Sequence, residues 1–286
     1  MNILFCAAEA APFIKVGGLA DVIGALPNAL HGLGHDVRIM MPFYGVLKER
    51  GVVGTKVGST FSVSALGEKH TITIYQTALP PHQTPVYLLD WPGQFAGQAY
   101  DTKQGPDDLR EGVRRFFLFS LAAAHAIDHL PWPVEFLHCH DWHAGGVPVF
   151  RDVLKTKRIP SVFSIHNLSI QGKWNAQEAL SWVQFEQIDH PLLNTRDGEG
   201  NANMLLWGVV GADAVATVSP QYSREILTPE FGEGLHPFLQ QRGVQGIVNG
   251  IDADVFNPAT DRLIHSTYTA ETVSAGKSLN KTTLQA

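Results

Sequence analysis

Short apolar runs alternate with amphipathic helical stretches along most of this 286-residue chain. The first run covers residues 2–8, and apolar residues then recur at helical spacing from Leu19 to Leu33 before a second run at residues 36–41. In such an alternation each strand is followed by a helix that packs back onto the sheet. The pattern therefore predicts an α/β fold, with a parallel sheet covered by helices on both faces.

The rest of the chain continues this pattern with one addition. Four further runs of buried-strand type lie at residues 134–138, 160–165, 214–218 and 244–248. A long helix is expected over residues 107–127, and residues 174–203 have only weak periodicity. Between glycine and proline turns, three segments predict a β-rich insertion, at residues 60–63, 70–75 and 86–90. Ligands of open parallel sheets bind beyond the carboxyl ends of the strands, so we expect functional residues there.

Lys15, Gly17 and Gly18 lie between the first predicted strand and the first predicted helix. Unpaired backbone N–H groups and the helix dipole favour an anion at a helix N-terminus, and Lys15 adds a positive charge. A Gly-Gly pair can also form a plain tight turn, which is the alternative at this position. Two familiar phosphate motifs are excluded, because Gly24 breaks the G-x-G-x-x-G spacing and no segment has the full Walker spacing.

Three histidines and one aspartate lie close together after the run at residues 134–138, namely His138, His140, Asp141 and His143. One interpretation is a metal site, because histidine and carboxylate groups are common ligands. Neighbouring side chains of a strand point to opposite faces, however, and this run has no closing ligand from elsewhere. We therefore expect no metal, and regard His138 and His140 as packed, hydrogen-bonded polar residues.

Charge and composition narrow the class of protein. A formal net charge of −6 with dispersed Lys and Arg residues argues against a nucleic-acid partner. Cys6 and Cys139 lie in apolar runs and are expected to be buried free thiols, which suits a reducing compartment. The N-terminus lacks the positive region of a signal peptide, and no apolar run approaches the length of a membrane span. These features predict a cytoplasmic protein without membrane contacts, and a processed plastid protein is the alternative.

Six motifs follow one another in a defined order. They are Lys15-Val16-Gly17-Gly18-Leu19-Ala20-Asp21-Val22, Gly34-His35-Asp36-Val37, His138-Cys139-His140-Asp141-Trp142-His143-Ala144-Gly145, Ser164-Ile165-His166-Asn167-Leu168 with Gln171-Gly172, Thr217-Val218-Ser219-Pro220 with Tyr222, and Val248-Asn249-Gly250-Ile251-Asp252. Together, over about residues 1 to 260, they resemble the bacterial glycogen synthase and plant starch synthase family (glycosyltransferase family 5).

This resemblance implies a fold and an activity. The fold would be the N-terminal, Rossmann-like half of a GT-B glycosyltransferase, with the β-rich segments as an insertion. The activity would be transfer of glucose from ADP-glucose to the non-reducing end of an α-1,4-glucan such as glycogen or starch, with retention and without a cofactor. Residues 1–262 would form the first domain, and residues 263–286 the linker and the beginning of the second domain.

The resemblance also implies roles for single residues. Lys15 and the amides of Gly17 and Gly18 would face the donor diphosphate, and His166 would lie near the transferred glucose, so that Lys15, Asp141 and His166 form the catalytic set. Sugar hydroxyls would be oriented by short polar side chains, those of Asp21, Asp141, Asn167 and Asn249. Tyr100 would stack on the acceptor.

Several features depart from the family pattern. Val16 replaces a Thr or Ser, Ile170 stands where an aromatic residue is common, and Leu206 stands where a lysine is expected. Residues 274–286 resemble the beginning of the second GT-B domain, which would supply a basic pair, an acidic residue and the nucleotide pocket. Without that domain, this tail is expected to fray.

Three hypotheses about function follow. The first is the N-terminal half of an ADP-glucose-dependent synthase that needs the missing C-terminal domain. The second is an inactive remnant that binds glucan or another synthase chain. The third is a GT-B transferase that uses a different nucleotide sugar, which the combination of the first and third motifs makes less favourable.

Overall fold

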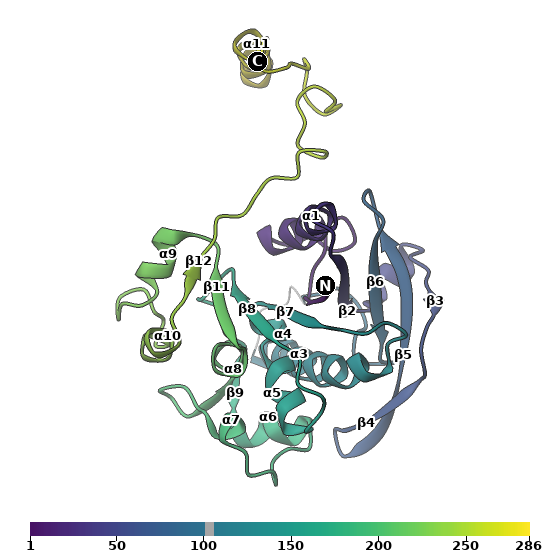
Figure 1. The fold of residues 1–286 in the computed structure, drawn as a ribbon, viewed down its shortest axis with the longest axis vertical. Helices are drawn as coiled ribbons and strands as arrows, with labels where there is room; N and C mark the ends of the chain where they lie inside the picture. Colours follow the sequence, from purple (N-terminus) through teal and green to yellow (C-terminus); the bar gives the residue numbers. More distant parts are fainter. Residues whose placement is uncertain (101–105) are drawn as a thin grey trace. The chain divides into compact units, whose positions relative to one another are not determined.

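A sheet of ten strands organises the first part of the chain (Figure 1). The computed structural model describes residues 1–100 and 106–286. Seven strands of the sheet are parallel, in the order β12 (Gln245–Gly246), β11 (Ala214–Thr217), β8 (Ser161–Ile165), β7 (Phe136–His140), β1 (Asn2–Cys6), β2 (Asp36–Pro42) and β6 (Thr84–Asp90). The predicted α/β fold with a parallel sheet is therefore confirmed.

The β-rich segments extend this sheet. Strand β5 (Glu68–Leu79) pairs antiparallel with β6, and both β4 (Phe61–Ala65) and β3 (Thr55–Lys56) pair antiparallel with β5. Strand β6 also pairs in parallel with β2. The third predicted segment, residues 86–90, is thus part of the main sheet, and only β3, β4 and β5 form the antiparallel addition.

Helices lie on both sides of the parallel strands (Figure 1). Helix α1 (Gly18–Gly32) lies on one side, and the longer α3 (Pro106–Ala126) lies on the other with α5 (Gly146–Val153) and α8 (Met204–Gly211). The helix predicted over residues 107–127 is confirmed as α3. The shorter elements of this part of the chain are α2 (Gly45–Glu49), a 3₁₀ turn (Ile127–His129), α4 (Asp141–Ala144), β9 (Lys173–Asn175), α6 (Ala176–Trp182), α7 (Pro191–Asn194), β10 (Asn201–Asn203), α9 (Pro220–Glu225) and α10 (His236–Arg242).

The centre of the core is the pair of strands β1 and β7. Their register places Phe5 beside His138 and Cys6 beside Cys139, and both cysteines are buried free thiols as predicted. Because the two strands end at the same level, the segments that follow them emerge together at the carboxyl edge of the sheet. This edge carries the candidate site residues.

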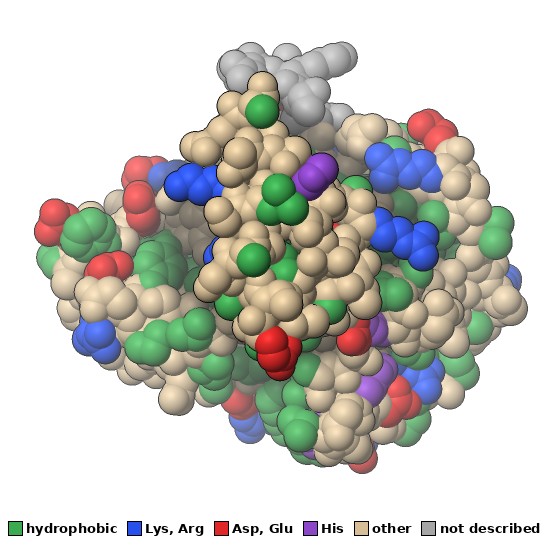
Figure 2. Space-filling view, turned by 90° about the horizontal axis from the view of Figure 1, so that it is seen from above, with side chains coloured by type: hydrophobic (Ala, Val, Ile, Leu, Met, Phe, Trp, Pro, Cys, Tyr) green, Lys and Arg blue, Asp and Glu red, His purple; other side chains and the backbone are tan. Residues whose placement is uncertain are grey.

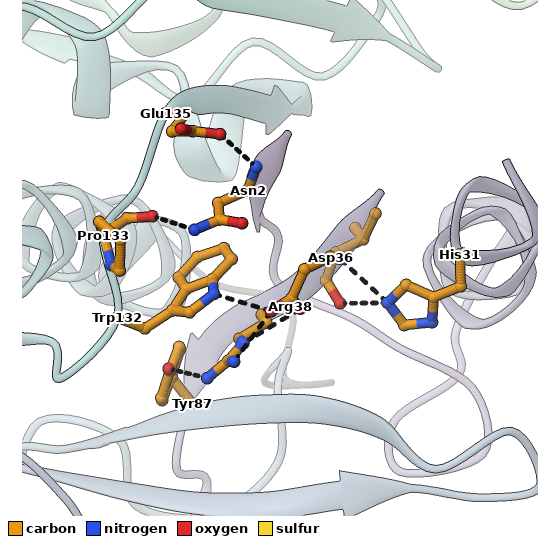
Figure 3. Close-up of polar contacts among 9 residues, drawn as sticks. Asn2, His31, Asp36, Arg38, Tyr87, Trp132, Pro133 and Glu135 are labelled. Atoms are coloured by element: carbon orange, nitrogen blue, oxygen red, sulfur yellow. Dashed lines mark hydrogen bonds and ion pairs between the residues drawn. The ribbon is translucent and has the colours of Figure 1, made fainter. Parts of the chain in front are cut away.

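The opposite, amino-terminal edge carries the Gly34-His35-Asp36-Val37 motif. Asp36 accepts hydrogen bonds from Arg38 and from the indole of Trp132, and Arg38 donates to the Tyr87 hydroxyl at 2.7 Å (Figure 3). The Arg38 guanidinium also lies 4.5 Å from the centre of the Trp132 ring. The hydrogen bond from Arg38 is the main cause of a lowered pKa for Asp36. This motif therefore holds β2 to its neighbours.

The chain divides into two compact units, residues 1–249 and 250–286. In the second unit α11 (Val273–Gln285) packs Gly276 against Tyr268, and Asn280 hydrogen bonds to both backbone groups of Ser266. The domain boundary expected at residue 262 and the fraying of the tail stay predictions. Across the described residues, no helix is both long enough and apolar enough to cross a membrane.

Candidate active site

An open cavity of about 650 Å³ lies at the carboxyl edge of the sheet, within the first unit. Segments that follow different strands line it: Glu9, Val16, Gly17, Gly18 and Leu19 after β1, Tyr100 after β6, Asp141, Trp142 and His143 after β7, His166, Asn167 and Ile170 after β8, Val218 after β11 and Asn249 after β12. Seven of the nine predicted site residues are in this set. Lys15 and Asp21 are not.

Glu9 holds the glycine loop in place, although no motif or spacing in the sequence singles it out. Glu9 is 4% exposed, and one oxygen of its carboxylate accepts the backbone N–H groups of Val16 (2.7 Å) and Gly17 (3.1 Å). The other oxygen accepts the hydroxyl of Tyr100 at 2.8 Å. The Gly17 amide, predicted to face a phosphate, therefore already has a partner. The Gly18 amide begins α1 without a side-chain cap and has no hydrogen-bond partner within the described residues, so it is open to an anion.

The orientation of Tyr100 is fixed by its hydrogen bond to Glu9 and by packing of its ring. Its ring centre lies 5.3 Å from that of His143 and 5.8 Å from that of Phe116. Desolvation raises the pKa of Tyr100, so its hydroxyl stays protonated and donates to Glu9. The predicted stacking role therefore depends on a ring that the protein holds in one orientation.

Asp141 joins the ends of β7 and β8. One of its carboxylate oxygens accepts the backbone N–H groups of His166 (2.7 Å) and Asn167 (3.2 Å). Its φ of 53° is in the left-handed region, which Asp tolerates better than most side chains. Desolvation raises the pKa of Asp141 to about 7, against the effect of those two hydrogen bonds. Asp141 therefore positions the His166 segment, and its other oxygen has no hydrogen-bond partner within the described residues.

His166 lines the cavity, and its ring contacts the buried ring of His140. The Nε2 atom of His166 lies 3.1 Å from Nδ1 of His140, which is 1% exposed. Desolvation lowers the pKa of His166 to about 4, and it lowers the pKa values of His138 and His143 to about 3. These rings are neutral at pH 7, so they can hydrogen bond but supply no positive charge.

The sequence model of the starch synthase catalytic domain matches residues 2–241. This chain belongs to the starch synthase catalytic domain family.

Among relatives of this family, glycogen synthase 1 of Synechocystis sp. is 38% identical over 96% of this chain and 52% of its own length. The glycogen synthase of Trichodesmium erythraeum is 39% identical over 96% of this chain and 54% of its own length. The catalytic domain of starch synthase IV from Arabidopsis thaliana, solved with ADP and acarbose bound, is 30% identical with a TM-score of 0.82, over 99% of this chain and 58% of that one. The chain thus spans about half the length of the curated relatives it matches.

The predicted cation of this starch synthase domain, Lys15, directly precedes the lining residues Val16, Gly17 and Gly18 but does not itself line the cavity. Lys15 Nζ forms an ion pair with Asp21 at 2.7 Å, and the two side chains are 52% and 41% exposed. An exposed pair of this kind contributes only about 0–1 kcal/mol, so little free energy opposes its exchange for a ligand. Figure 2 shows Lys and Arg side chains scattered over the viewed face rather than gathered in one basic patch.

The two asparagines predicted to contact sugars differ in their attachment. Asn167 is exposed, and its side-chain oxygen accepts the backbone N–H of Ser169 at 2.9 Å. Asn249 is exposed at the cavity wall. The amide nitrogen of each side chain has no hydrogen-bond partner within the described residues, so both can donate to a ligand.

The three departures from the family pattern lie in different environments. Val16 and Ile170 are exposed apolar side chains at the cavity. Leu206 is fully buried in α8, whose first six residues are all buried. A leucine at this position therefore adds to the core, and its side chain does not line the cavity.

The Gln171-Gly172 motif of the family packs against Trp142, which lines the cavity. Gly172 has a φ of 60°, and a Cβ there would lie 2.0 Å from the Trp142 ring. The Gln171 side chain accepts from Asn203 at 2.6 Å and donates to the carbonyl of Glu233 at 2.9 Å. Only glycine fits this approach, so the motif serves to pack the segment after β8 against Trp142.

Proposed function

We propose that this chain is the N-terminal half of a retaining glucosyltransferase that moves glucose from ADP-glucose to the non-reducing end of an α-1,4-glucan. One observation carries the proposal: the Gly17-Gly18 loop, Asp141 and His166 converge on one cavity although they follow three different strands. The names of the relatives, and the ADP and acarbose bound to the Arabidopsis starch synthase IV, support these substrates. They also favour a transferase over a remnant that only binds glucan.

The chemistry assigns different tasks to these groups. Retaining transfer develops positive charge at the anomeric carbon and negative charge on the departing diphosphate. Of the predicted catalytic residues, only Lys15 carries positive charge at pH 7, because burial keeps His166 neutral. In our proposal Lys15 leaves Asp21 and joins the open Gly18 amide at the N-terminus of α1 to bind the diphosphate.

The remaining residues would orient the sugars. His166, Asn167 and Asn249 offer hydrogen-bonding groups at the cavity wall, and Asp141 fixes the segment that carries the first two. Tyr100 would contact the acceptor with its ring. The second GT-B domain would close the cavity and complete the nucleotide site, and a cytoplasmic location remains part of the proposal.

The test is transfer of labelled glucose from ADP-glucose to glycogen, by this chain alone and by a form joined to a second GT-B domain. We expect transfer only from the joined form. Lys15→Ala should lower its turnover by at least about 100-fold, because a preorganised charge at a leaving group contributes on this scale. Lys56→Ala, an exposed lysine in β3, is the matched control and should leave turnover unchanged. Full activity of Lys15→Ala would refute the assignment of the diphosphate site.

A further inference from the structure

His140 contacts the ring of a cavity residue without lining the cavity itself. It is the last residue of β7 and is 1% exposed, and its Nδ1 lies 3.1 Å from Nε2 of His166. Its other surroundings are the ring of His138, stacked at 3.9 Å, and the ring of Phe5 at 5.0 Å. The His140 ring is therefore packed against His138 on one face and against Phe5 beside this stack, and among the described residues the polar contact of its ring is with His166.

In this contact one neutral ring must donate an N–H and the other must accept it with a bare nitrogen. Burial keeps both rings uncharged, since it lowers the pKa of His166 to about 4 and that of His140 well below its usual range. A neutral imidazole has one N–H donor and one bare nitrogen. Either His140 donates from Nδ1, or His166 donates from Nε2, and each choice determines where the second proton of the pair lies.

The second nitrogen of His140 separates these two cases. Its Nε2 is buried and has no hydrogen-bond partner within the described residues. If His166 were the donor, His140 would carry its own proton on Nε2, as a buried N–H without an acceptor. Orphaned buried N–H groups are rarer in proteins than undersatisfied acceptors. The shared proton therefore belongs to Nδ1 of His140, and the proton of His166 lies on its own Nδ1.

We propose that His140 is a positioning residue that holds His166 in the Nδ1–H tautomer, so that the ring presents a hydrogen-bond donor to an oxygen of the bound substrate. The tautomer does not depend on the proposed function, whereas its use toward a sugar hydroxyl or a phosphate oxygen rests on it. The nitrogen of a histidine that carries the proton is set by the hydrogen bond of the other nitrogen. Here the buried His140 would determine that His166 offers an N–H donor, rather than a bare nitrogen, to a ligand in the cavity.

The tautomer can be measured directly by long-range ¹H–¹⁵N correlation on the ¹⁵N-histidine-labelled chain, with His166→Gln to assign the signal. We expect the Nδ1–H pattern for His166 at pH 7.5. In His140→Phe, which keeps a ring but has no donor, we expect the population of this tautomer to fall by at least half. In His140→Asn, whose amide can donate in place of Nδ1–H, we expect it to be retained. His125→Phe is the control, because His125 stacks on Phe61 in another part of the fold and should leave His166 unchanged.

An Nε2–H pattern in the unmodified chain would overturn the proposal, and this measurement stands even if a variant fails to fold. An unchanged tautomer in a folded His140→Phe chain would also overturn it. Addition of ADP or of maltotriose then identifies the acceptor: a shift of the His166 Nδ1 signal with one ligand supports the donor role toward phosphate or sugar, respectively. No shift with either ligand, when the Gly18 amide signal shows saturation, would overturn that role. Failure of glucose transfer with the Nδ1–H tautomer intact would refute the proposed function alone.

Discussion

At the scale of single residues, two buried carboxylates organise the candidate site by accepting backbone N–H groups. Glu9 binds the loop after β1, and Asp141 binds the segment after β8. Backbone amides at strand ends have no sheet partner, and a buried unpaired amide costs free energy. Each carboxylate thus stabilises a loop conformation that the cavity needs.

The role of Glu9 is tested by Glu9→Gln. One carboxylate oxygen of Glu9 becomes an amide nitrogen in glutamine, and this nitrogen cannot accept a hydrogen bond. Either the backbone N–H groups of Val16 and Gly17 or the Tyr100 hydroxyl then lose their acceptor. We expect the free energy of unfolding in urea to fall by about 1–3 kcal/mol. Glu49→Gln, at an exposed position, should change it by less than about 0.5 kcal/mol. Equal effects of the two substitutions would contradict the role of Glu9.

Asp141→Asn tests the charge at the second carboxylate. The folded-state pKa of about 7 lies above the ordinary value, so this group contributes stability at low pH that is lost as the pH rises toward 7. Asparagine tolerates the left-handed backbone and stays neutral. Relative to the unmodified chain, the variant should therefore gain stability between pH 4 and pH 8, by up to about 4 kcal/mol. A stability difference independent of pH in urea titrations would show that the carboxyl does not titrate in this range.

At the scale of elements, α8 is apolar on all sides because it packs in the interior. Gly208 lies against Phe163 of β8, and a Cβ there would lie 2.4 Å from the Phe163 ring. The helix can approach the sheet this closely only because the position has no side chain. The Leu206-Trp207-Gly208 sequence thus fits a helix that is buried against β8 and the neighbouring helices.

Two Gly→Ala substitutions separate packing from helix propensity. Gly208→Ala should destabilise the protein by about 1–3 kcal/mol, because the added methyl group overpacks the interface with Phe163. Gly112→Ala, in α3 where a Cβ would meet nothing within 4 Å, should stabilise it by up to about 1 kcal/mol. Thermal unfolding of both variants gives the comparison. A stabilised Gly208→Ala protein would contradict the close contact of α8.

At the scale of the whole molecule, acid should unfold the protein at mild pH. His138, His140, His143 and His166 have lowered pKa values in the fold, so the unfolded chain binds their protons first as the pH falls below about 6.5. Their contribution to stability is present above that pH and is lost below it. Asp141 opposes them by binding one proton in the folded state, so these five groups together leave a difference of about three protons, and the lowered pKa of His125 adds to it.

Each proton changes stability by roughly 1.4 kcal/mol per pH unit, so the free energy of unfolding should fall by roughly 4 kcal/mol per unit near pH 5. Urea titrations at pH 7, 6 and 5 measure this slope. His140→Asn should reduce it by about one proton, because the asparagine does not titrate. A flat profile between pH 7 and pH 5 would show that these histidines are charged in the folded protein.

The local patterns in the sequence predicted most elements of the fold but not their contacts. Short apolar runs located the parallel strands to within a few residues, because burial on both faces of a sheet demands such runs. The Gly17-Gly18 loop and Asp141 could be singled out because they sit where strands end. Glu9 could not, since Tyr100, 91 positions along the chain, is one of its partners. The pairing of Lys15 with Asp21 likewise has no local signal in the sequence.

The sequence by itself determined the fold class, the order of the strands along the chain and the family, because these follow from periodicity and from motifs read in order. Only the tertiary structure decided which polar atoms meet. Hydrogen bonds form between atoms a few ångströms apart, and neighbouring strands bring together residues far apart in the chain. For that reason the Glu9 contact, the hold of Asp141 on His166 and the His140–His166 pair appear only in the folded molecule.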